Sequence, residues 1–147
     1  MNLPEDQIKL LIKTAYKMMN FSYVPYSRFT VGAALLCDSD KIYSGCNIEN
    51  AAFGPSICAE RTALFKAISD GEKKFKAIAI CGGPEKNTND YCMPCGVCRQ
   101  VMREFCDDDF LIICAKNTEE YQLFQLKELL PCSFKPEGII GADSCKN

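Results

Sequence analysis

Histidine and tryptophan are both absent from this sequence of 147 residues. Without histidine, the chain cannot build a Ser-His-Asp triad, a Cys-His nucleophile pair or an HExxH zinc site, and it has no imidazole base. Cysteine and carboxylate side chains must therefore carry any catalytic or metal chemistry. Cysteine is plentiful, with 11 in the chain. Because this number is odd and no secretory leader is visible, we expect free thiols or metal thiolates in a reducing compartment, and not a disulfide scaffold.

Long hydrophobic runs and a strong excess of one charge are also missing. The longest apolar runs, Val31 to Cys37 and Phe110 to Ala115, are far shorter than the roughly 20 residues that span a bilayer. Glu5 and Asp6 stand where a signal peptide would have basic and then apolar residues. Lys and Arg total 17 against 19 acidic residues, a net charge of -2, so no positive field favours nucleic acid. We expect a soluble, cytoplasmic protein with neither nucleic acid nor membrane as a partner.

The order of predicted elements indicates an α/β fold. At roughly 150 residues per domain, the length corresponds to one domain over residues 1–147. Alternating strands and helices favour a three-layer α/β/α domain with a mixed β-sheet of about five strands, flanked by helices. Periodicity and turn residues predict helices over residues 4–20, 94–105 and 126–130, and a further helix that is opened by Pro55, capped by Ser56 and ended at Gly71. They predict strands over residues 30–37, 41–46, 76–81, 110–115 and 120–124. Residues 82–93 are predicted to form a polar loop.

Two short cysteine motifs lie where helices are expected to begin. The first is Cys58-Ala59-Glu60 and the second is Pro94-Cys95-Gly96-Val97-Cys98. Cys95 and Cys98 are three residues apart, so on one helical turn their sulfurs can bind one ion, and free main-chain amides there stabilise thiolates. With Cys58 as a third ligand, one tetrahedral position stays open. Open positions are typical of catalytic zinc sites, where the ion lowers the pKa of a bound water.

Two charged side chains beside Cys58 fit such a site. Three thiolates and a dication carry a formal charge of -1, and Arg61 is placed to offset this charge by donating hydrogen bonds to the ligand sulfurs. Glu60 lies two residues after Cys58, about 200° around a regular helix, so both can face one pocket only if Cys58 belongs to the irregular first turn. Glu60 is then suited to move protons as a general acid and base.

Structural interpretations of the same residues remain open. A lone CxxC is common in structural zinc sites and in redox pairs, and Cys92 could supply a fourth ligand that closes the site. Glu60 could serve only as an acidic residue that the helix dipole favours. Cys81, Cys106 and Cys114, together with Cys92, are most simply interpreted as small buried hydrophobic residues.

The segments C-A-E-R-T-A at 58–63 and P-C-G-V-C-R-Q at 94–100 resemble the signature of zinc-dependent deaminases. P-Y-S-R-F-T-V-G-A-A-L-L at 25–36 and G-C-N-I-E-N-A at 45–51 narrow the resemblance to small homotetrameric cytidine deaminases, and it extends to S-F-K-P at 133–136. The resemblance implies a cytidine deaminase-like fold and a hydrolase of pyrimidine salvage that converts cytidine and deoxycytidine to uridine and deoxyuridine and releases ammonia. A zinc-bound hydroxide would attack carbon 4, with Glu60 as the proton shuttle.

The same resemblance implies roles for individual residues. Cys58, Cys95 and Cys98 would bind one Zn²⁺ per chain. Asn47 and Glu49 would hold the ribose hydroxyls, Phe29 would pack on the base, and Ala59 would complete the nucleoside site. Phe134 would enter the active site of a neighbouring subunit, so we expect a homotetramer with its sites at subunit interfaces.

Two residues depart from the family pattern. Lys135 replaces a smaller residue after Phe134, and Phe53 replaces a tyrosine whose hydroxyl could bond near the ligand. Alternative functions are a deaminase of another cytosine compound, such as an aminonucleoside antibiotic, a zinc module whose cysteines only hold the fold, and a redox protein that uses Cys95 and Cys98.

Overall fold

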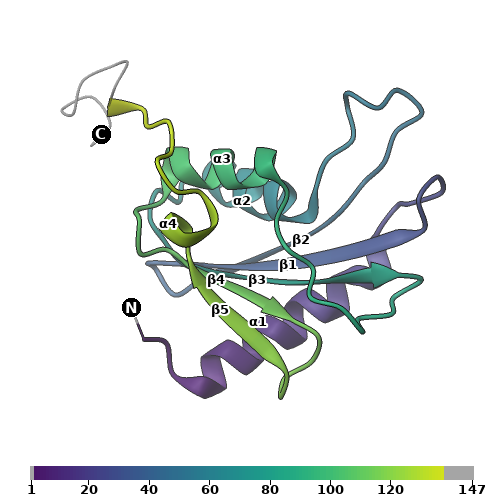
Figure 1. Ribbon diagram of the computed structural model, residues 1–147, viewed down its shortest axis with the longest axis horizontal. Coiled ribbons are helices and arrows are strands. Elements are labelled where there is room, and N and C mark those ends of the chain that lie inside the picture. Colours follow the sequence, from purple (N-terminus) through teal and green to yellow (C-terminus); the bar gives the residue numbers. More distant parts are fainter. Residues whose placement is uncertain (1, 138–147) are drawn as a thin grey trace.

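The structure is a computed structural model, and it describes residues 2–137. A five-stranded sheet forms the middle layer of the protein. Helix α1 covers one face of the sheet, and α2 and α3 cover the other (Figure 1). This arrangement confirms the predicted α/β class and its mixed five-stranded sheet, although the predicted domain of residues 1–147 reaches beyond the described residues at both ends. The elements are α1 (Glu5–Met18), the 3-10 turn η1 (Met19–Phe21), β1 (Phe29–Cys37), β2 (Ile42–Cys46), α2 (Ala59–Ser69), β3 (Phe75–Pro84), α3 (Gly96–Phe105), β4 (Leu111–Ala115), β5 (Tyr121–Gln125) and α4 (Leu126–Leu129).

The direction of the strands places the beginnings of α2 and α3 at the same edge of the sheet. The strand order is β2-β1-β3-β4-β5, and β1 is antiparallel to both β2 and β3. Strands β2 and β3 therefore run in the same direction, and β4 is parallel to β3. Helix α2 follows the end of β2 and α3 follows the end of β3, so both crossovers start at one edge. Functional sites of open α/β sheets commonly lie at this edge.

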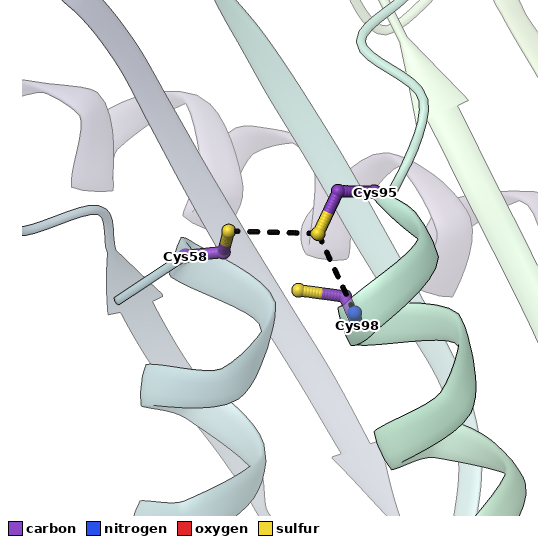
Figure 2. Close-up of side chains that lie close together, drawn as sticks. All are labelled: Cys58, Cys95 and Cys98. Atoms are coloured by element: carbon purple, nitrogen blue, oxygen red, sulfur yellow. Dashed lines mark hydrogen bonds between the residues drawn. The ribbon is translucent and has the colours of Figure 1, made fainter. Parts of the chain in front are cut away.

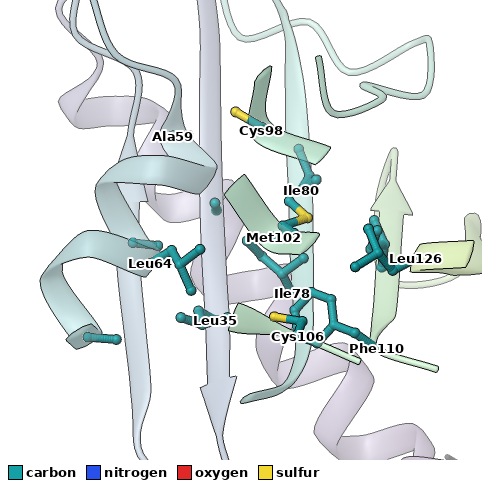
Figure 3. Packing of buried hydrophobic residues seen from close by; sticks show 14 of the residues in the cluster. Leu35, Ala59, Leu64, Ile78, Ile80, Cys98, Met102, Cys106, Phe110 and Leu126 are labelled. Carbon is teal, nitrogen blue, oxygen red and sulfur yellow. The ribbon is translucent and has the colours of Figure 1, made fainter. Parts of the chain in front are cut away.

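Each face of the sheet buries its own hydrophobic cluster. Along β1, Ala33 and Leu35 pack toward α2 and α3, whereas Ala34 and Leu36 pack toward α1. This alternation follows from the two-residue period of a strand, and both sets are hydrophobic because helices cover both faces. Figure 3 shows the first cluster, in which side chains of the sheet, α2 and α3 meet around Met102.

Three predicted boundaries were wrong. Helix α2 begins at Ala59 and not at Pro55, and the hydroxyl of Ser56 accepts a hydrogen bond from the Asn50 N–H (3.1 Å) in place of capping the helix. Helix α3 begins at Gly96, two residues after Pro94. Strand β3 continues to Pro84 through part of the predicted loop, because β1 offers it a strand partner as far as Phe29. Tertiary pairing here overrides the low strand propensity of consecutive glycines.

Helix α1 packs directly on the backbone of β1 at Gly32. A Cβ atom at Gly32 would lie 1.9 Å from the main-chain oxygen of Ala15. We therefore expect Gly32→Ala to lower the free energy of unfolding by about 3 kcal/mol or more, since rigid backbone cannot yield to the added methyl group. Gly54→Ala is the matched control, because no atom lies within 4 Å of its Cβ position. Urea unfolding midpoints measure both, and equal midpoints for the two variants would contradict the tight α1–β1 contact.

Within residues 2–137, no helix has both the length and the apolar character needed to cross a membrane.

Candidate metal centre

Three cysteines from the beginnings of α2 and α3 converge at the shared edge of the sheet. Cys58 is the residue that precedes α2 and Cys95 is the residue that precedes α3, and both have extended backbone conformations. The Sγ atoms of Cys58 and Cys95 are 3.8 Å apart, and those of Cys58, Cys95 and Cys98 all lie within 4.8 Å of one another. Figure 2 shows the three side chains pointing toward a common centre. Gly45 allows the first turn of α2 to pack closely on β2, because a Cβ there would lie 2.5 Å from the main-chain oxygen of Ala59.

The sulfur geometry suits a tetrahedral zinc ion. Zinc–thiolate bonds of about 2.3 Å in a tetrahedron place the ligand sulfurs about 3.8 Å apart, which matches the observed distance of 3.8 Å between Cys58 and Cys95. The main-chain N–H of Cys98 also donates a hydrogen bond to the Cys95 sulfur (3.4 Å). This donor stabilises a thiolate at the positive end of α3. The residues present therefore fit zinc.

The thiols of the cluster differ in how readily they ionise. The pKa of Cys58 is lowered to about 5, first by a hydrogen bond from the Cys98 thiol and further by Arg61 and Cys95. The pKa of Cys98 is raised, because its thiol makes that hydrogen bond and is buried. Adjacent thiols thus resist ionising together in the absence of a cation, and a dication would remove this repulsion.

Arg61 lies directly against the cluster. Its Nη2 atom donates a hydrogen bond to the Cys58 sulfur over 3.4 Å, and its Nε is buried without a protein partner among the described residues. Arg61 thus contacts one of the three sulfurs, that of Cys58.

Glu60 is the buried carboxylate of the site. It is only 4 % exposed, and it lies in the first turn of α2. Burial raises its pKa to about 7, and the negative charge of Cys58 acts in the same direction. Because Cys58 has an extended backbone (ψ 155) and lies before the regular helix, it and Glu60 can face the same site despite their spacing of two residues. A carboxyl group with a pKa near neutrality is suited to accept and return a proton.

Cys92 does not belong to the three-cysteine cluster. Its sulfur packs against Gly82, where an added Cβ would lie 2.8 Å from it, and burial raises its thiol pKa to about 12. Cys81, Cys106 and Cys114 are buried in the two hydrophobic clusters, as predicted. Every cysteine within residues 2–137 is a free thiol. The described residues thus provide three thiolate ligands and no fourth one from Cys92.

Four other predicted site residues lie at the ends of elements or in the loops that join them: Asn47 and Glu49 follow β2, Phe29 begins β1 and Ala59 begins α2. The Asn47 side chain bonds the main chain of β1, and Glu49 accepts a hydrogen bond from the Ser27 N–H (3.2 Å). Ala59 is fully buried in the first turn of α2. Phe29 is 40 % exposed and lines a cavity of about 170 Å³ together with Cys92.

The C-terminal segment with Phe134 is held by residues that the sequence interpretation did not single out. Arg99 donates hydrogen bonds to the carbonyls of Pro94 (2.7 Å) and Leu129 (2.8 Å), and Gln100 donates to the carbonyl of Phe134 (3.1 Å). The available signal was the Arg-Gln pair that ends the P-C-G-V-C-R-Q segment. The Phe134 side chain itself is 67 % exposed.

Comparisons with known proteins agree with this geometry. Residues 5–114 match the family described as the cytidine and deoxycytidylate deaminase zinc-binding region. A cytidine deaminase of Sporosarcina psychrophila is 42% identical over 132 residues, which cover 90% of this chain and 94% of that protein. The chain belongs to the cytidine deaminase family. A second cytidine deaminase, from Halalkalibacterium halodurans, is 45% identical over 131 residues, covering 89% of this chain and 96% of that one.

Solved structures show the same cytidine deaminase fold. The crystal structure of cytidine deaminase from Burkholderia pseudomallei superposes with a TM-score of 0.77 at 40% sequence identity, and the match covers 85% of this chain and 97% of that one. The family is a zinc-binding one, and the three-cysteine cluster supplies suitable ligands. The resemblance inferred from the cysteine motifs is confirmed.

Arg61 provides a first test of the cytidine deaminase metal centre. Arg61→Gln removes the positive charge beside the Cys58 sulfur, so we expect zinc affinity to fall by about 10–100-fold. Competition with a chelator measures this loss. Arg61→Lys, which keeps a charge without the planar donor group, should lie between wild type and Arg61→Gln. Unchanged affinity in Arg61→Gln would show that Arg61 does not stabilise the ligand thiolate.

Proposed function

We propose that the protein hydrolyses cytidine and deoxycytidine to uridine and deoxyuridine and releases ammonia. One observation carries the proposal: a cluster of three thiolate ligands lies beside a buried carboxylate, Glu60, whose pKa is raised to about 7. A closed structural zinc site has no use for such a carboxylate, whereas hydrolysis needs a group that moves protons.

Each residue of the centre has a distinct role in the proposed reaction. Cys58, Cys95 and Cys98 hold the zinc ion, which when bound supplies the Lewis acidity that makes water a nucleophile at neutral pH. Glu60 accepts one proton from the attacking water and passes it to the ring nitrogen N3. It then accepts the second proton, from the new hydroxyl on carbon 4, and passes it to the departing amino group. Water thus supplies the new oxygen at carbon 4, and the amino group leaves as ammonia. Arg61 offsets the negative charge of the thiolates.

The nucleoside site is assigned to the beginnings of β1 and α2 and to the loop that follows β2. Asn47 and Glu49 bind the ribose hydroxyls, and Phe29 packs on the base. Ala59 begins α2, where main-chain N–H groups lack helical acceptors and can donate to the base. Cytidine and deoxycytidine should both be turned over, whereas cytosine should react poorly because it leaves the hydroxyl-binding groups unpaired. Chromatographic measurement of uracil-containing products from the three compounds tests this assignment, and preferential turnover of cytosine would contradict it.

We also propose that the protein is a homotetramer with its active sites at subunit interfaces. The single chain exposes large apolar side chains, including Phe53 (85 %) and Phe134 (67 %). Exposed aromatic groups of this kind are typical of interfaces. Phe53 and Lys135, the two residues that differ from the family pattern, would then lie where subunits meet.

Light scattering tests the assembly, with an expected mass four times that of the 16.4 kDa chain. If Phe134 completes a neighbour's site, Phe134→Ala should lose activity, and co-assembly with Glu60→Gln should restore part of it. Mixed tetramers would contain sites that combine an intact Glu60 with an intact Phe134 from another chain. A fully active monomer would contradict this proposal.

We also propose that the enzyme acts in the cytoplasm, in pyrimidine salvage.

A further inference from the structure

The first residues of β1 lack a strand neighbour on the side of β2. Strand β1 pairs with β3 from Phe29 onward, but its pairing with β2 starts only at Gly32, which lies opposite Cys46. The main-chain groups of Phe29 and Val31 on that side must therefore find other partners or bond water. This short edge carries the proposed base-binding side chain.

Asn47 takes the place of the missing strand. It directly follows β2, and its Oδ1 accepts a hydrogen bond from the Val31 N–H (2.9 Å) while its Nδ2 donates one to the Phe29 carbonyl (2.8 Å). Its own main-chain N–H donates to the Val31 carbonyl (3.2 Å). The side-chain amide keeps one N–H and one oxygen lone pair free, so it can bind a substrate hydroxyl at the same time.

Ser27 binds the other polar group of Phe29. Its hydroxyl accepts a hydrogen bond from the Phe29 N–H (3.0 Å). Both the N–H and the carbonyl of Phe29 are thus bound by side chains. The Ser27 N–H also donates to Glu49 Oε1 (3.2 Å), so one residue contacts both a proposed base-binding and a proposed ribose-binding residue.

The backbone conformation of Arg28, the residue before Phe29, makes it necessary to hold the main chain of Phe29 in place. Arg28 has a φ of 56°, in the left-handed region that costs a non-glycine residue about 1 kcal/mol. Its N–H bonds the Val24 carbonyl (3.0 Å), and its carbonyl accepts from the Glu85 N–H (2.9 Å). The chain therefore enters β1 through a strained corner, and Phe29 would move if this corner relaxed.

We propose that Ser27 and Asn47 form a clamp on the main chain of Phe29, and that this clamp positions the Phe29 ring against the substrate base. Ser27 is thereby a positioning residue for the reaction, and Asn47 has a positioning role besides its contact with ribose. The inference rests on the proposed function, because it is Phe29's packing on the base that gives the clamp its effect.

Ser27→Ala tests the clamp with little risk to the fold, because Ser27 is exposed and its N–H contact with Glu49 is kept. We expect kcat/KM for cytidine to fall by about 3–10-fold, the effect of one lost hydrogen bond. Ser22→Ala is the matched control, since the Ser22 hydroxyl donates to the Val31 carbonyl (3.2 Å) on the same edge without contacting Phe29. Its kcat/KM should stay at the wild-type value.

A double-mutant cycle separates positioning from a general structural role. In a Phe29→Leu background, which removes the ring, Ser27→Ala should change kcat/KM by less than about 2-fold, because the two changes affect one interaction. Equal losses in both backgrounds would overturn the proposal, as would a Ser27→Ala variant that matches wild type.

Hydrogen exchange tests the clamp without any catalytic readout. The Phe29 amide should exchange about 3–10-fold faster in Ser27→Ala and at the wild-type rate in Ser22→Ala. Unchanged exchange in Ser27→Ala would show that the clamp does not exist. Failure of the proposed function is distinguishable, because it would appear as a wild-type protein that is inert toward cytidine.

Discussion

Glu60→Gln is expected to lower kcat for cytidine deamination by about 10³-fold while the protein still binds one zinc ion per chain. Glutamine has the shape of glutamate but cannot carry a proton between the attacking water, the base and the departing amine. Because Glu60 is only 4 % exposed, this isosteric change is a cleaner test than alanine, which would leave a cavity. Steady-state kinetics and metal analysis of the same preparation measure the two quantities.

The control for this variant is Glu104→Gln, which makes the same chemical change at an exposed position of α3. It should retain wild-type activity and zinc. Appreciable remaining activity in Glu60→Gln would remove Glu60 from the mechanism. Loss of zinc together with activity would instead indicate that Glu60 supports the metal site.

Cys98→Ala is expected to abolish deamination by removing a zinc ligand. Cys98 is 1 % exposed, and its sulfur lies within 4.8 Å of those of Cys58 and Cys95. A site with two remaining thiolates should bind zinc more than about 100-fold more weakly, since loss of a direct ligand exceeds the 10–100-fold effect of an outer hydrogen-bond partner. Metal analysis after dialysis against a weak chelator should find the variant largely free of zinc.

Cys132→Ala is the control, because Cys132 is an exposed free thiol outside the cluster. It should keep its zinc and its activity. If Cys98→Ala kept one tightly bound zinc ion per chain, the assignment of the three cysteines as ligands would be wrong and another ligand set would hold the metal.

The convergence of the three cysteines could be predicted from the sequence because Cys58, Cys95 and Cys98 lie at helix beginnings, where spacing and local geometry are tightly linked. The spacing of Cys58 and Glu60 required an irregular first turn, and the extended backbone of Cys58 provides it. The role of Cys92 could not be decided in the same way. Its exclusion from the cluster depends on packing against Gly82, a contact between distant segments that spacing does not encode.

The fold class was predictable from alternating strands and helices, whereas several boundaries depended on tertiary contacts. Pro55 and Ser56 are residues typical of a helix N-terminus. Ser56 nevertheless accepts a hydrogen bond from the Asn50 N–H within the preceding loop, and the helix begins only at Ala59. The clamp on Phe29 could not be predicted from the sequence either. It depends on the pairing of the two strands, because β2 does not extend along the first residues of β1 and Asn47 replaces the missing strand neighbour. The role proposed for Phe134 involves a second chain, so it was inferred from the family resemblance and not from contacts within one chain.

Ammonia release from cytidine during zinc titration of the metal-free protein tests the central claim most directly. We expect activity to rise in proportion to added zinc and to reach a plateau at one equivalent per chain, with cytidine turned over far better than cytidine monophosphate or cytosine. Absence of turnover for all three compounds at one bound zinc per chain would contradict it, and would leave the cysteine cluster as a structural zinc site or as the centre of a deaminase for another amino-substituted substrate.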